Sequence, residues 1–337
     1  MPIDKEKIAR ENILRESEEA IGKSVRGYDF DNGVDFDEIV KSFETTGAQA
    51  TNLYKAIEII REMRREKATI YLGYTSNMVT GGLREVFRFL AKHKMVDVMV
   101  TTAGGIEEDI IKCLGDFKIG DFFLEGRKLR EKGINRAGNI LIPNSRYCRF
   151  EEFIIPILEK EYQKQKKEGK ILSARKLIWL LGEKINNKDS IYFWANKNKI
   201  PVFCPAITDG SLGDMIYFFK SRHPDFILDV SEDIVEMNNS TIGREKTGLI
   251  ILGGGVVKHH ICNANMFRNG ADFAVYINNA EEHDGSDAGA RPDEAVSWGK
   301  IRPDAKTVKV FGDASIIFPI VVSQTFAHNF NSSDAPE

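Results

Sequence analysis

The chain has 337 residues, a formal net charge of -3, 42% hydrophobic residues and 29% charged residues. These proportions are typical of an ordinary soluble protein, long enough to bury a substantial core as one large domain or two small ones. The nearly balanced charge excludes a strongly basic protein, so it gives no reason to expect a nucleic-acid or anionic-membrane surface.

The chain has four cysteines and no CxxC pair, which favours free thiols in a reducing compartment over a disulfide framework. Its opening residues, MPIDKEKIARENILRESEEA, are charged and lack the apolar core of a signal peptide. Its longest apolar runs, such as LIILGGGVV at residues 249–257, are too short to span a bilayer. We therefore expect a cytoplasmic protein.

The N-terminal stretch to about Gly22 is rich in Glu, Lys and Arg with a few Ile and Leu, a pattern that predicts a solvated helix with a thin apolar side. Two further helical patterns follow in residues 35–46 and 52–67. Residues 151–200 form another helical stretch, with an exposed lysine-rich piece at residues 163–170.

From Ala68 the pattern changes to short β-branched or apolar runs that end in small polar or glycine-rich turns, with helical patterns between them. Strands that alternate with helices indicate a doubly wound, mostly parallel sheet, that is, a Rossmann-like α/β fold with a helical N-terminal arm. The predicted strands are residues 68–74, 97–101, 201–206, 249–252, 272–277 and 306–311, with 226–231 as a further candidate.

No convincing linker divides the chain. We expect a helical arm at residues 1–24, a single α/β domain at residues 25–330 and a flexible tail at residues 331–337. Sheets of this class bind ligands at the carboxyl ends of their strands, which is where the glycine-rich turns lie.

Glycine-rich turns that open helices let a ligand approach the backbone, and the first-turn N–H groups point at an anion such as a pyrophosphate. The runs Gly253-Gly254-Gly255 and Gly104-Gly105 fit this description, and an acid at a neighbouring strand end can bond ribose hydroxyls. The candidate acids are Glu108, Asp209 and Asp313. Each turn by itself is more typical of tight packing than of a ligand site, and the GxGxxG fingerprint is absent.

The stretch RPDEAVSWGK at residues 291–300 places Lys300 two positions after Trp298. A lysine is a nucleophile only when it is neutral, and an apolar wall such as an indole favours the neutral form. A neutral amine can attack a carbonyl or imine carbon and form a Schiff base. The alternative is a surface lysine in a turn before Arg302-Pro303.

Nearby carboxylates work against such a nucleophile because they stabilise the charged amine. They lie at Asp284, Asp287, Asp293 and Glu294. A substrate that carries its own positive charges, such as a polyamine, would pair with these acids and leave the amine free. Asp214 could hold the far ammonium, and Trp298 could add a cation–π contact.

His259 follows the glycine turn and is a candidate general base near neutral pH. It could equally be a helix-cap or packing histidine. His259, His260 and Cys262 have poor spacing for metal ligands on one helical turn and no matching partner set, so we expect no metal site.

Long motifs that follow one another in order resemble the deoxyhypusine synthase family, and together they cover nearly the whole chain from about Val25. They are VRGYDFDNGVDFDEIVKSFETTGAQATNLYKAI, LGYTSNMVTGG, VTTAGGIEEDIIKC, PVFCPAITDGSLGDMI, LGGGVVKHHICNANMFRNGADFAVYI, NGADFAVYINNAEEHDGSDAGARPDEAVSWGK and KVFGDASIIFPIVV. The resemblance implies that residues 25–330 form an NAD-binding catalytic domain.

The resemblance implies an NAD-dependent transfer of the aminobutyl group of spermidine to one lysine of the translation initiation factor 5A precursor. NAD removes a hydride next to the secondary amine of spermidine, 1,3-diaminopropane leaves, and the four-carbon piece passes through an enzyme-lysine imine to the substrate lysine. Bound NADH then reduces the imine. The family is a homotetramer whose sites are shared across a dimer interface, and its N-terminal helix can cover a neighbour's entrance.

The resemblance also implies site residues by their motif positions. Lys300 matches the covalent lysine and His259 the base. The substrate-binding positions are Glu107, Glu108, Asp214, His259, Gly285, Ser286, Asp287, Glu294 and Trp298. The cofactor-binding positions are Ser76, Asn77, Met78, Val79, Thr80, Thr102, Ala103, Gly104, Glu108, Asp209, Gly254, Asn279, Ala280, Asp313 and Ala314.

Three positions depart from the family pattern. Asn279 stands where a threonine is frequent, Ala288 where a serine is common, and His283 where an aromatic is usual. We expect the first two changes to tune cofactor affinity rather than to abolish it.

Two alternatives remain at the level of sequence. A homospermidine synthase would share the pocket chemistry and pass the aminobutyl group to putrescine. A silent regulatory subunit would assemble with an active paralogue, but such a chain would be expected to lack the nucleophile that Lys300 supplies.

Overall fold

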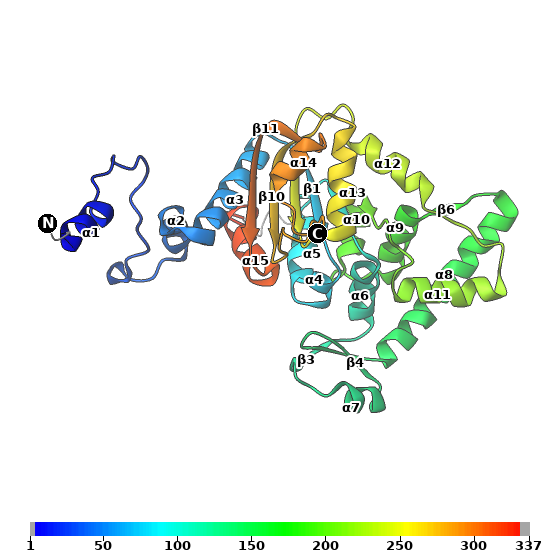
Figure 1. Cartoon of the computed structure of the whole chain (residues 1–337). Coiled ribbons are helices and arrows are strands. Elements are labelled where there is room, and N and C mark those ends of the chain that lie inside the picture. The colour runs from blue at the N-terminus through cyan, green and yellow to red at the C-terminus, as the bar shows by residue number, and fades with distance from the viewer. Residues whose placement is uncertain (1–3, 331–337) are drawn as a thin grey trace.

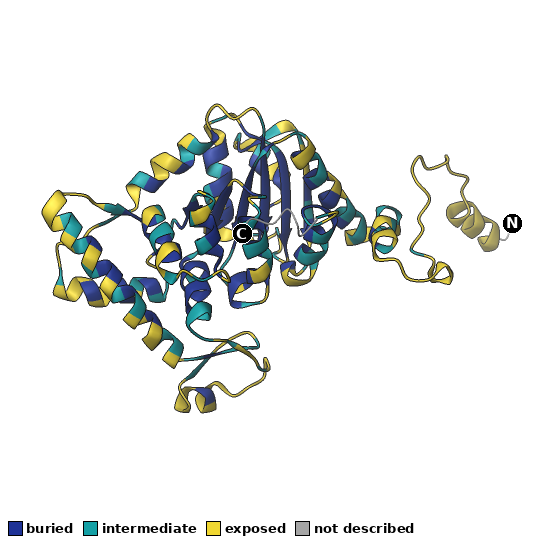
Figure 2. Cartoon of the chain, turned by 180° about the vertical axis from the view of Figure 1, so that it is seen from behind, coloured by how far each residue is buried: buried dark blue, intermediate teal, exposed yellow. Residues whose placement is uncertain are grey.

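The computed structural model describes residues 4–330; the predicted tail of residues 331–337 lies outside this range. The N-terminal arm contains one helix, α1 (Lys5–Ile13), with no buried residue. Residues 14–29 form no helix or strand, so the prediction of helix to about Gly22 is wrong beyond Ile13. α1 stands clear of the main body in Figure 1, and the whole arm is exposed in Figure 2.

The two helical patterns that follow the arm are confirmed as α2 (Phe36–Thr46) and α3 (Ala48–Arg65). A short 3-10 helix, η1 (Phe30–Asn32), precedes them. The side chain of Asp35 accepts a hydrogen bond from the Glu38 backbone at 3.0 Å and so caps α2. Gly47, at φ 94°, separates the two helices in a conformation that favours glycine.

The centre of the molecule is a six-stranded sheet in the order β7-β2-β1-β9-β10-β11, with every neighbouring pair parallel. Its strands are β1 (Thr69–Tyr74), β2 (Val98–Thr101), β7 (Val202–Phe203), β9 (Thr247–Leu252), β10 (Ala271–Asn278) and β11 (Ile301–Phe311). This is the doubly wound strand order of dinucleotide-binding folds. Successive strands are added in one direction across the sheet from β1 to β7 and in the other direction from β9 to β11, so the order reverses between β1 and β9. The fold class is confirmed although the GxGxxG fingerprint is missing.

The sheet has a hydrophobic core on each face. The side chains of consecutive strand residues pack into opposite cores, because side chains alternate across a sheet. Ile250 belongs to the core that includes α3, α5 (Leu83–Lys92) and α15 (Ala314–Gln324). Its neighbour Ile251 belongs to a smaller core with α13 (Gly255–Met266) and Ala295 of α14 (Pro292–Ser297). The sheet is buried on both faces (Figure 2), as the apolar strand sequences require.

The remaining helices surround the β7 side of the sheet or extend away from it (Figure 1). They are α4 (Asn77–Thr80), α6 (Ala103–Leu114), α7 (Gly126–Glu131), α8 (Ser145–Glu168), α9 (Ala174–Ile185), α10 (Ile191–Lys197), α11 (Ser211–Arg222) and α12 (Ser231–Thr241). Within residues 4–330, we find no helix with the length and hydrophobicity that a bilayer crossing requires.

Two small sheets lie outside the central one. The predicted strand at residues 226–231 is only β8 (Leu228–Asp229), and it pairs with β6 (Leu172–Ser173) rather than with the main sheet. An antiparallel sheet of β3 (Lys118–Ile119), β5 (Ile140–Pro143) and β4 (Ile134–Ala137) was not predicted. Its strands have two or four residues, too short for a periodicity signal to emerge.

Candidate active site

The carboxyl edge of the sheet carries two long helices whose first turns are not capped by a side chain. α6 begins after Thr102 and α13 after Gly254, and neither N-cap residue makes a side-chain capping bond. The free N–H groups of such first turns bind anions. The Thr102 hydroxyl instead accepts a hydrogen bond from the Ser76 backbone at 3.1 Å, which ties the turn after β2 to the turn after β1.

Glycine at this edge is required by close packing. A Cβ at Gly104 would lie 2.8 Å from the Cβ of Ser76, and one at Gly254 would lie 2.5 Å from the Cα of Ala288. Gly253 has φ +82° and would meet the Thr75 hydroxyl at 2.8 Å. These turns bring exposed backbone close together, as a cradle for a pyrophosphate requires, so the edge fits the NAD that the resemblance implies.

Glu108 is a buried acid at the same edge, with 9% of its surface exposed. It accepts a hydrogen bond from the hydroxyl of Thr80. Burial raises the pKa of its carboxyl to about 7, although the Thr80 hydrogen bond works in the opposite direction. Glu108 therefore changes its charge near neutral pH, which is typical of residues in functional sites.

Glu107 has a structural contact that the sequence did not reveal. Its Oε2 accepts a hydrogen bond from the Leu212 backbone at 2.7 Å, so it satisfies a first-turn N–H of α11. Burial raises the pKa of its carboxyl, and the nearby charge of Asp214 adds to the effect. Asp214 is exposed in the first turn of α11, where a negative charge is stabilised by the helix dipole.

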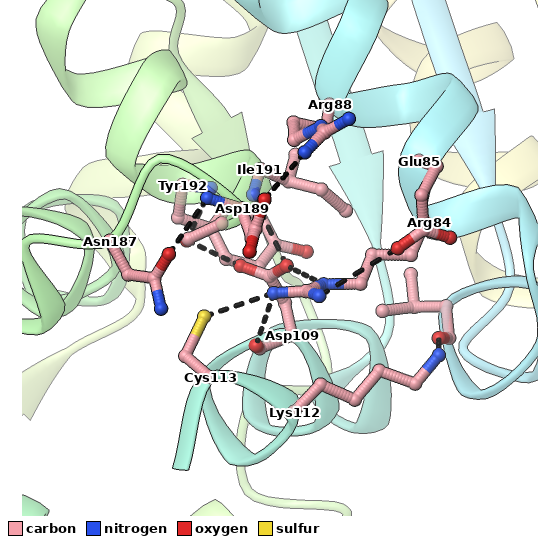
Figure 3. A network of polar contacts seen from close by, with 12 residues as sticks. Arg84, Glu85, Arg88, Asp109, Lys112, Cys113, Asn187, Asp189, Ile191 and Tyr192 are labelled. Carbon is pink, nitrogen blue, oxygen red and sulfur yellow. Dashed lines mark hydrogen bonds and ion pairs between the residues drawn. The ribbon is translucent and has the colours of Figure 1, made fainter. Parts of the chain in front are cut away.

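A buried ionic network holds the helix that carries these two acids (Figure 3). Asp109 of α6 accepts hydrogen bonds from Arg84 Nε at 2.7 Å, from the Ser190 hydroxyl at 2.5 Å and from the Ile191 backbone at 3.1 Å. Arg84 also donates to Cys113 Sγ at 2.9 Å. The network joins α5, α6 and the start of α10 directly behind Glu107 and Glu108.

The structure brings all the residues expected to contact the cofactor to this edge, in the segments after the main strands. The others are Ser76, Asn77, Met78, Val79, Thr80, Thr102, Ala103, Asp209, Asn279, Ala280, Asp313 and Ala314. The side chains of Met78 and Val79 belong to the core, so only their backbone is available to a ligand. The Asp313 side chain caps α15 through the Ser315 backbone at 2.8 Å.

Lys300 lies in a different place. It is 8% exposed, and its Nζ is 5.5 Å from the centre of the Trp298 ring. No hydrogen-bond or ion-pair partner of this amine is found among residues 4–330. Trp298 itself is 65% exposed. The exposed indole therefore lies beside an amine that is itself buried.

The cavity at Lys300 has a volume of about 30 Å³ and is enclosed by α13, α14 and the loop before α14. That volume holds about one water molecule. Its polar lining includes Lys258, Asp287, Arg291 and Glu294. One carboxylate oxygen of Asp287, Oδ2, is buried without a hydrogen-bond partner, a costly arrangement that a cationic ligand would relieve.

Four other residues expected to bind substrate line this cavity or are neighbours in sequence of residues that line it, whereas Glu107, Glu108 and Asp214 lie on α6 and α11. Gly285, Ser286 and Glu294 are exposed, and so is His259 on α13. Cys262 lies in the core and pairs with the Tyr276 hydroxyl at 3.2 Å, whereas burial lowers the pKa of His260 to about 4. In the described part of the chain, no group of three His, Cys, Asp or Glu residues is placed to hold a metal ion.

Lys300 and the cofactor edge are at opposite ends of the sheet. The Lys300 carbonyl accepts a hydrogen bond from Ala271, the first residue of β10, at 3.0 Å. Asn279 follows Asn278, the last residue of β10, which lies about 23 Å from Ala271 at roughly 3.3 Å per residue. Figure 1 shows α14 at the upper end of the sheet and α4, α6 and α15 at the lower end. Within one chain, Lys300 therefore lies at the opposite end of β10 from the cofactor edge.

Three buried or half-buried lysines beside the site were not predicted to have a role there. Lys112 donates hydrogen bonds to the carbonyls of Val79 and Gly81 at 2.6 and 2.8 Å. Lys258 and Lys309 each bind two carbonyls of the loop before α14. The sequence pointed to two of these lysines only by placing a charged residue within an apolar run, GVVKHH for Lys258 and TVKVF for Lys309.

Comparison with known proteins places the chain in one family. The family model for deoxyhypusine synthase matches residues 38–325. The chain is 52% identical over 355 residues to deoxyhypusine synthase from Senecio vernalis, covering 97% of this chain and 96% of that protein. It is also 52% identical over 344 residues to deoxyhypusine synthase from Arabidopsis thaliana, covering 94% of each.

A solved structure supports the same assignment. A protein from Entamoeba histolytica, itself assigned as a deoxyhypusine synthase, superposes with a TM-score of 0.68 at 36% sequence identity. The match covers 93% of this chain and 100% of that one. The motifs, the doubly wound fold and these matches agree, and the chain belongs to the deoxyhypusine synthase family, whose enzymes use NAD and spermidine to modify the translation initiation factor 5A precursor.

Proposed function

We propose that Lys300 is the amine that carries the aminobutyl group in this member of the family. The observation that carries the proposal is the state of its amino group, which is sheltered by Trp298 and has no hydrogen-bond partner within residues 4–330. Lys258 lines the same cavity, but its amine is bound by two carbonyls at 2.5 and 2.8 Å. Lys300 is the lysine of the pair that is available to react.

In this proposal the residues around Lys300 recognise the polyamine by charge. The unpartnered Oδ2 of Asp287 and the exposed carboxylate of Glu294 accept hydrogen bonds from ammonium groups. Gly285 and Ser286 line the exposed part of the loop, and Asp214 holds the far ammonium. His259, exposed on α13, takes the proton from the secondary amine as general base.

When bound, NAD would supply a hydride acceptor for the carbon beside the secondary amine of spermidine and would later return that hydride, so the overall reaction is a transfer without net oxidation. Lys300 attacks that activated carbon, and the bond to 1,3-diaminopropane breaks as this diamine leaves. Lys300 then holds the four-carbon group as an imine until the substrate lysine displaces it by a second exchange of amines. The shelter of Trp298 keeps water from hydrolysing the imine.

We propose that the carboxyl edge of the sheet holds the cofactor. The uncapped first turns of α6 and α13 bind the pyrophosphate. Glu108, Asp209 and Asp313 are the acids available for ribose hydroxyls. Ser76, Asn77, Thr80, Ala280 and Ala314 contribute the rest of the cradle together with backbone from Met78 and Val79.

The complete site requires two copies of the chain. Lys300 is separated from its own cofactor edge by the length of β10, and its cavity of about 30 Å³ is too small for a polyamine. A second copy that brings its Glu108 and Asp214 against Trp298 would complete the pocket. This arrangement agrees with the tetrameric family, in which sites are shared between subunits.

We also propose that the protein acts in the cytoplasm. All four cysteines are free thiols, and two of them are buried. Thiols in this state suit a reducing compartment.

Covalent trapping tests the proposal. The protein is incubated with NAD and spermidine, treated with borohydride, digested and mapped by peptide mass spectrometry. We expect an aminobutyl adduct on Lys300. An adduct on Lys258 would show that the assignment of the nucleophile to Lys300 is wrong. The absence of an adduct on both lysines would overturn a covalent mechanism.

The same preparation also tests the acceptor. Labelled spermidine is supplied with either the initiation factor 5A precursor or putrescine, and transfer to each is measured. We expect transfer to the protein lysine by this chain alone, as its family membership implies. Transfer to putrescine alone, or activity only after a paralogue is added, would contradict the proposed function.

A further inference from the structure

The acidic segment before α14 is a closed loop. Its two ends meet at Glu281 and Gly289, because a Cβ at Gly289 would lie 1.5 Å from the Glu281 carbonyl oxygen. Between them the chain carries the acids Glu282, Asp284 and Asp287. Arg291, just after the loop, pairs with Glu282, which leaves Asp284 and Asp287 as like charges whose repulsion opposes closure of a short loop.

Two lysines from different elements hold the loop. Lys309 of β11 donates to the carbonyls of Ala280 at 2.9 Å and Gly289 at 2.5 Å, one on each arm of the loop. Lys258 of α13 donates to the carbonyls of Asp287 at 2.5 Å and Ala290 at 2.8 Å. An ammonium has several donors and can bridge two carbonyls at once, and its charge also offsets the loop's acids.

Lys258 is unusually well buried for a lysine. It is 2% exposed, and its Nζ lies 4.6 Å from the centre of the Tyr276 ring. A lysine is rarely buried unless its amine is paired, and here the partners are backbone atoms rather than carboxylates. The Asp287 side chain is thereby left free, and its Oδ2 has no partner.

We propose that Lys309 and Lys258 are positioning residues that close the loop of residues 280–290 before any ligand binds and so present its acids to the polyamine. The inference rests on the proposed role of that loop in substrate binding. The loop links Ala280 at the cofactor edge to Asp287 at the Lys300 cavity, so its shape sets how the two parts of the site are arranged. Because both lysines bind backbone, neither competes with the substrate for the carboxylates.

The loop itself is measured first, without any ligand. Amide hydrogen exchange is followed for the peptide that covers residues 279–291 in the full-length protein and in Lys309→Met and Lys258→Met. Methionine keeps the length of the side chain and removes its donors. We expect exchange in this peptide to rise by about tenfold or more in both variants, with α13 and β10 unchanged.

Steady-state kinetics then test positioning. We expect the KM for spermidine to rise by about tenfold in both variants, with a smaller change in kcat. Lys309→Met should also weaken NAD binding in calorimetry, because the Lys309 amine holds the carbonyl of Ala280, an expected cofactor contact. Lys258→Met should change NAD binding by less than about twofold.

Lys220→Met is the matched control. Lys220 also binds two backbone carbonyls, those of Pro224 at 3.1 Å and Phe226 at 2.5 Å, but at the far end of α11. It should leave loop exchange and the KM unchanged. Lys309→Arg retains donors that can reach both carbonyls, and we expect it to restore wild-type values to within about threefold.

Two further points keep the outcomes distinct. If a methionine variant fails to fold, Gly289→Ala opens the same loop from the other side, because its methyl group collides with Glu281. If amide hydrogen exchange in the loop stays within about twofold of wild type in all these variants, the proposal that the two lysines close the loop is overturned. A looser loop with an unchanged KM would overturn its positioning role, whereas a missing Lys300 adduct in the wild type would overturn the proposed function alone.

Discussion

Arg84 Nε donates a hydrogen bond to Asp109 Oδ1 at 2.7 Å, and neither side chain is more than 7% exposed. The pair connects α5 to α6, the helix that carries Glu107 and Glu108. A buried ion pair contributes little over an apolar pair, but the loss of one partner leaves an uncompensated charge in the interior.

We therefore expect Asp109→Asn to lower the free energy of unfolding by about 3–5 kcal/mol, measured by urea unfolding. Arg88→Met is the matched control, because Arg88 forms a more exposed pair with Asp189 at 2.6 Å. That substitution should cost less than about 1 kcal/mol. Equal effects of the two substitutions would show that the buried pair has no special role.

Lys300→Ala should abolish transfer to the protein substrate and the borohydride adduct, because no other amine in the cavity is free to react. NAD binding, measured by calorimetry, should change by less than about twofold, since Lys300 is not among the residues proposed to hold the cofactor. Lys300→Arg should be equally inactive, because a guanidinium cannot lose its proton in a protein. Measurable transfer by either variant would exclude a covalent role for this residue.

The Glu108 carboxyl should make stability depend on pH. Its pKa is raised from 4.5 to about 7 by burial. Between these values the folded protein keeps a proton that the unfolded chain has lost, so the free energy of unfolding falls as pH rises. The full effect is present above about pH 7 and amounts to at most about 3 kcal/mol.

Glu108→Gln should remove this dependence, and it should be more stable than wild type at pH 8 but not at pH 4. Urea unfolding at both pH values measures the difference. Glu152→Gln, at an exposed position on α8, is the control and should follow the wild type. A Glu108→Gln variant that loses stability at pH 8 would show that the buried carboxylate is favourable to the fold.

Gly254→Ala should disturb the contact between α13 and the acidic loop. Its new methyl carbon would lie 2.5 Å from the Cα of Ala288, and backbone cannot yield as a flexible side chain can. We expect a loss of about 1–3 kcal/mol in stability and weaker NAD binding. Gly82→Ala is the control, because a Cβ there meets nothing within 4 Å; it should change stability by less than about 0.5 kcal/mol.

The sequence was sufficient for the architecture of the sheet. Apolar runs such as LIIL and DFAVYI, each closed by small or polar turn residues, correctly predicted β9 and β10. It was not sufficient for β3, β4 and β5, or for the end of α1 at Ile13. Short antiparallel strands and exposed, charged helices have weak periodicity, and their extent is set by contacts that a local pattern does not contain.

The site was predictable to a different extent. The motifs identified Lys300, Trp298, Asp287 and Glu108 as candidates, but not which of them meet in one chain. Lys300 precedes β11, and a strand carries its first and last residues to opposite ends of a sheet. No motif indicated that Lys258 and Lys309 bind loop carbonyls, because a hydrogen bond to backbone places no demand on the identity of the accepting residues.

By itself, the order of residues determined the alternation of strands and helices, the family, and the chemical types of group at the site. These follow from local periodicity and from motifs, which are properties of short stretches of chain. The tertiary structure decided which amine is free, which carboxylate oxygen lacks a partner and which acid has a pKa near neutrality. Those properties depend on burial and on neighbours that folding brings together from distant parts of the chain.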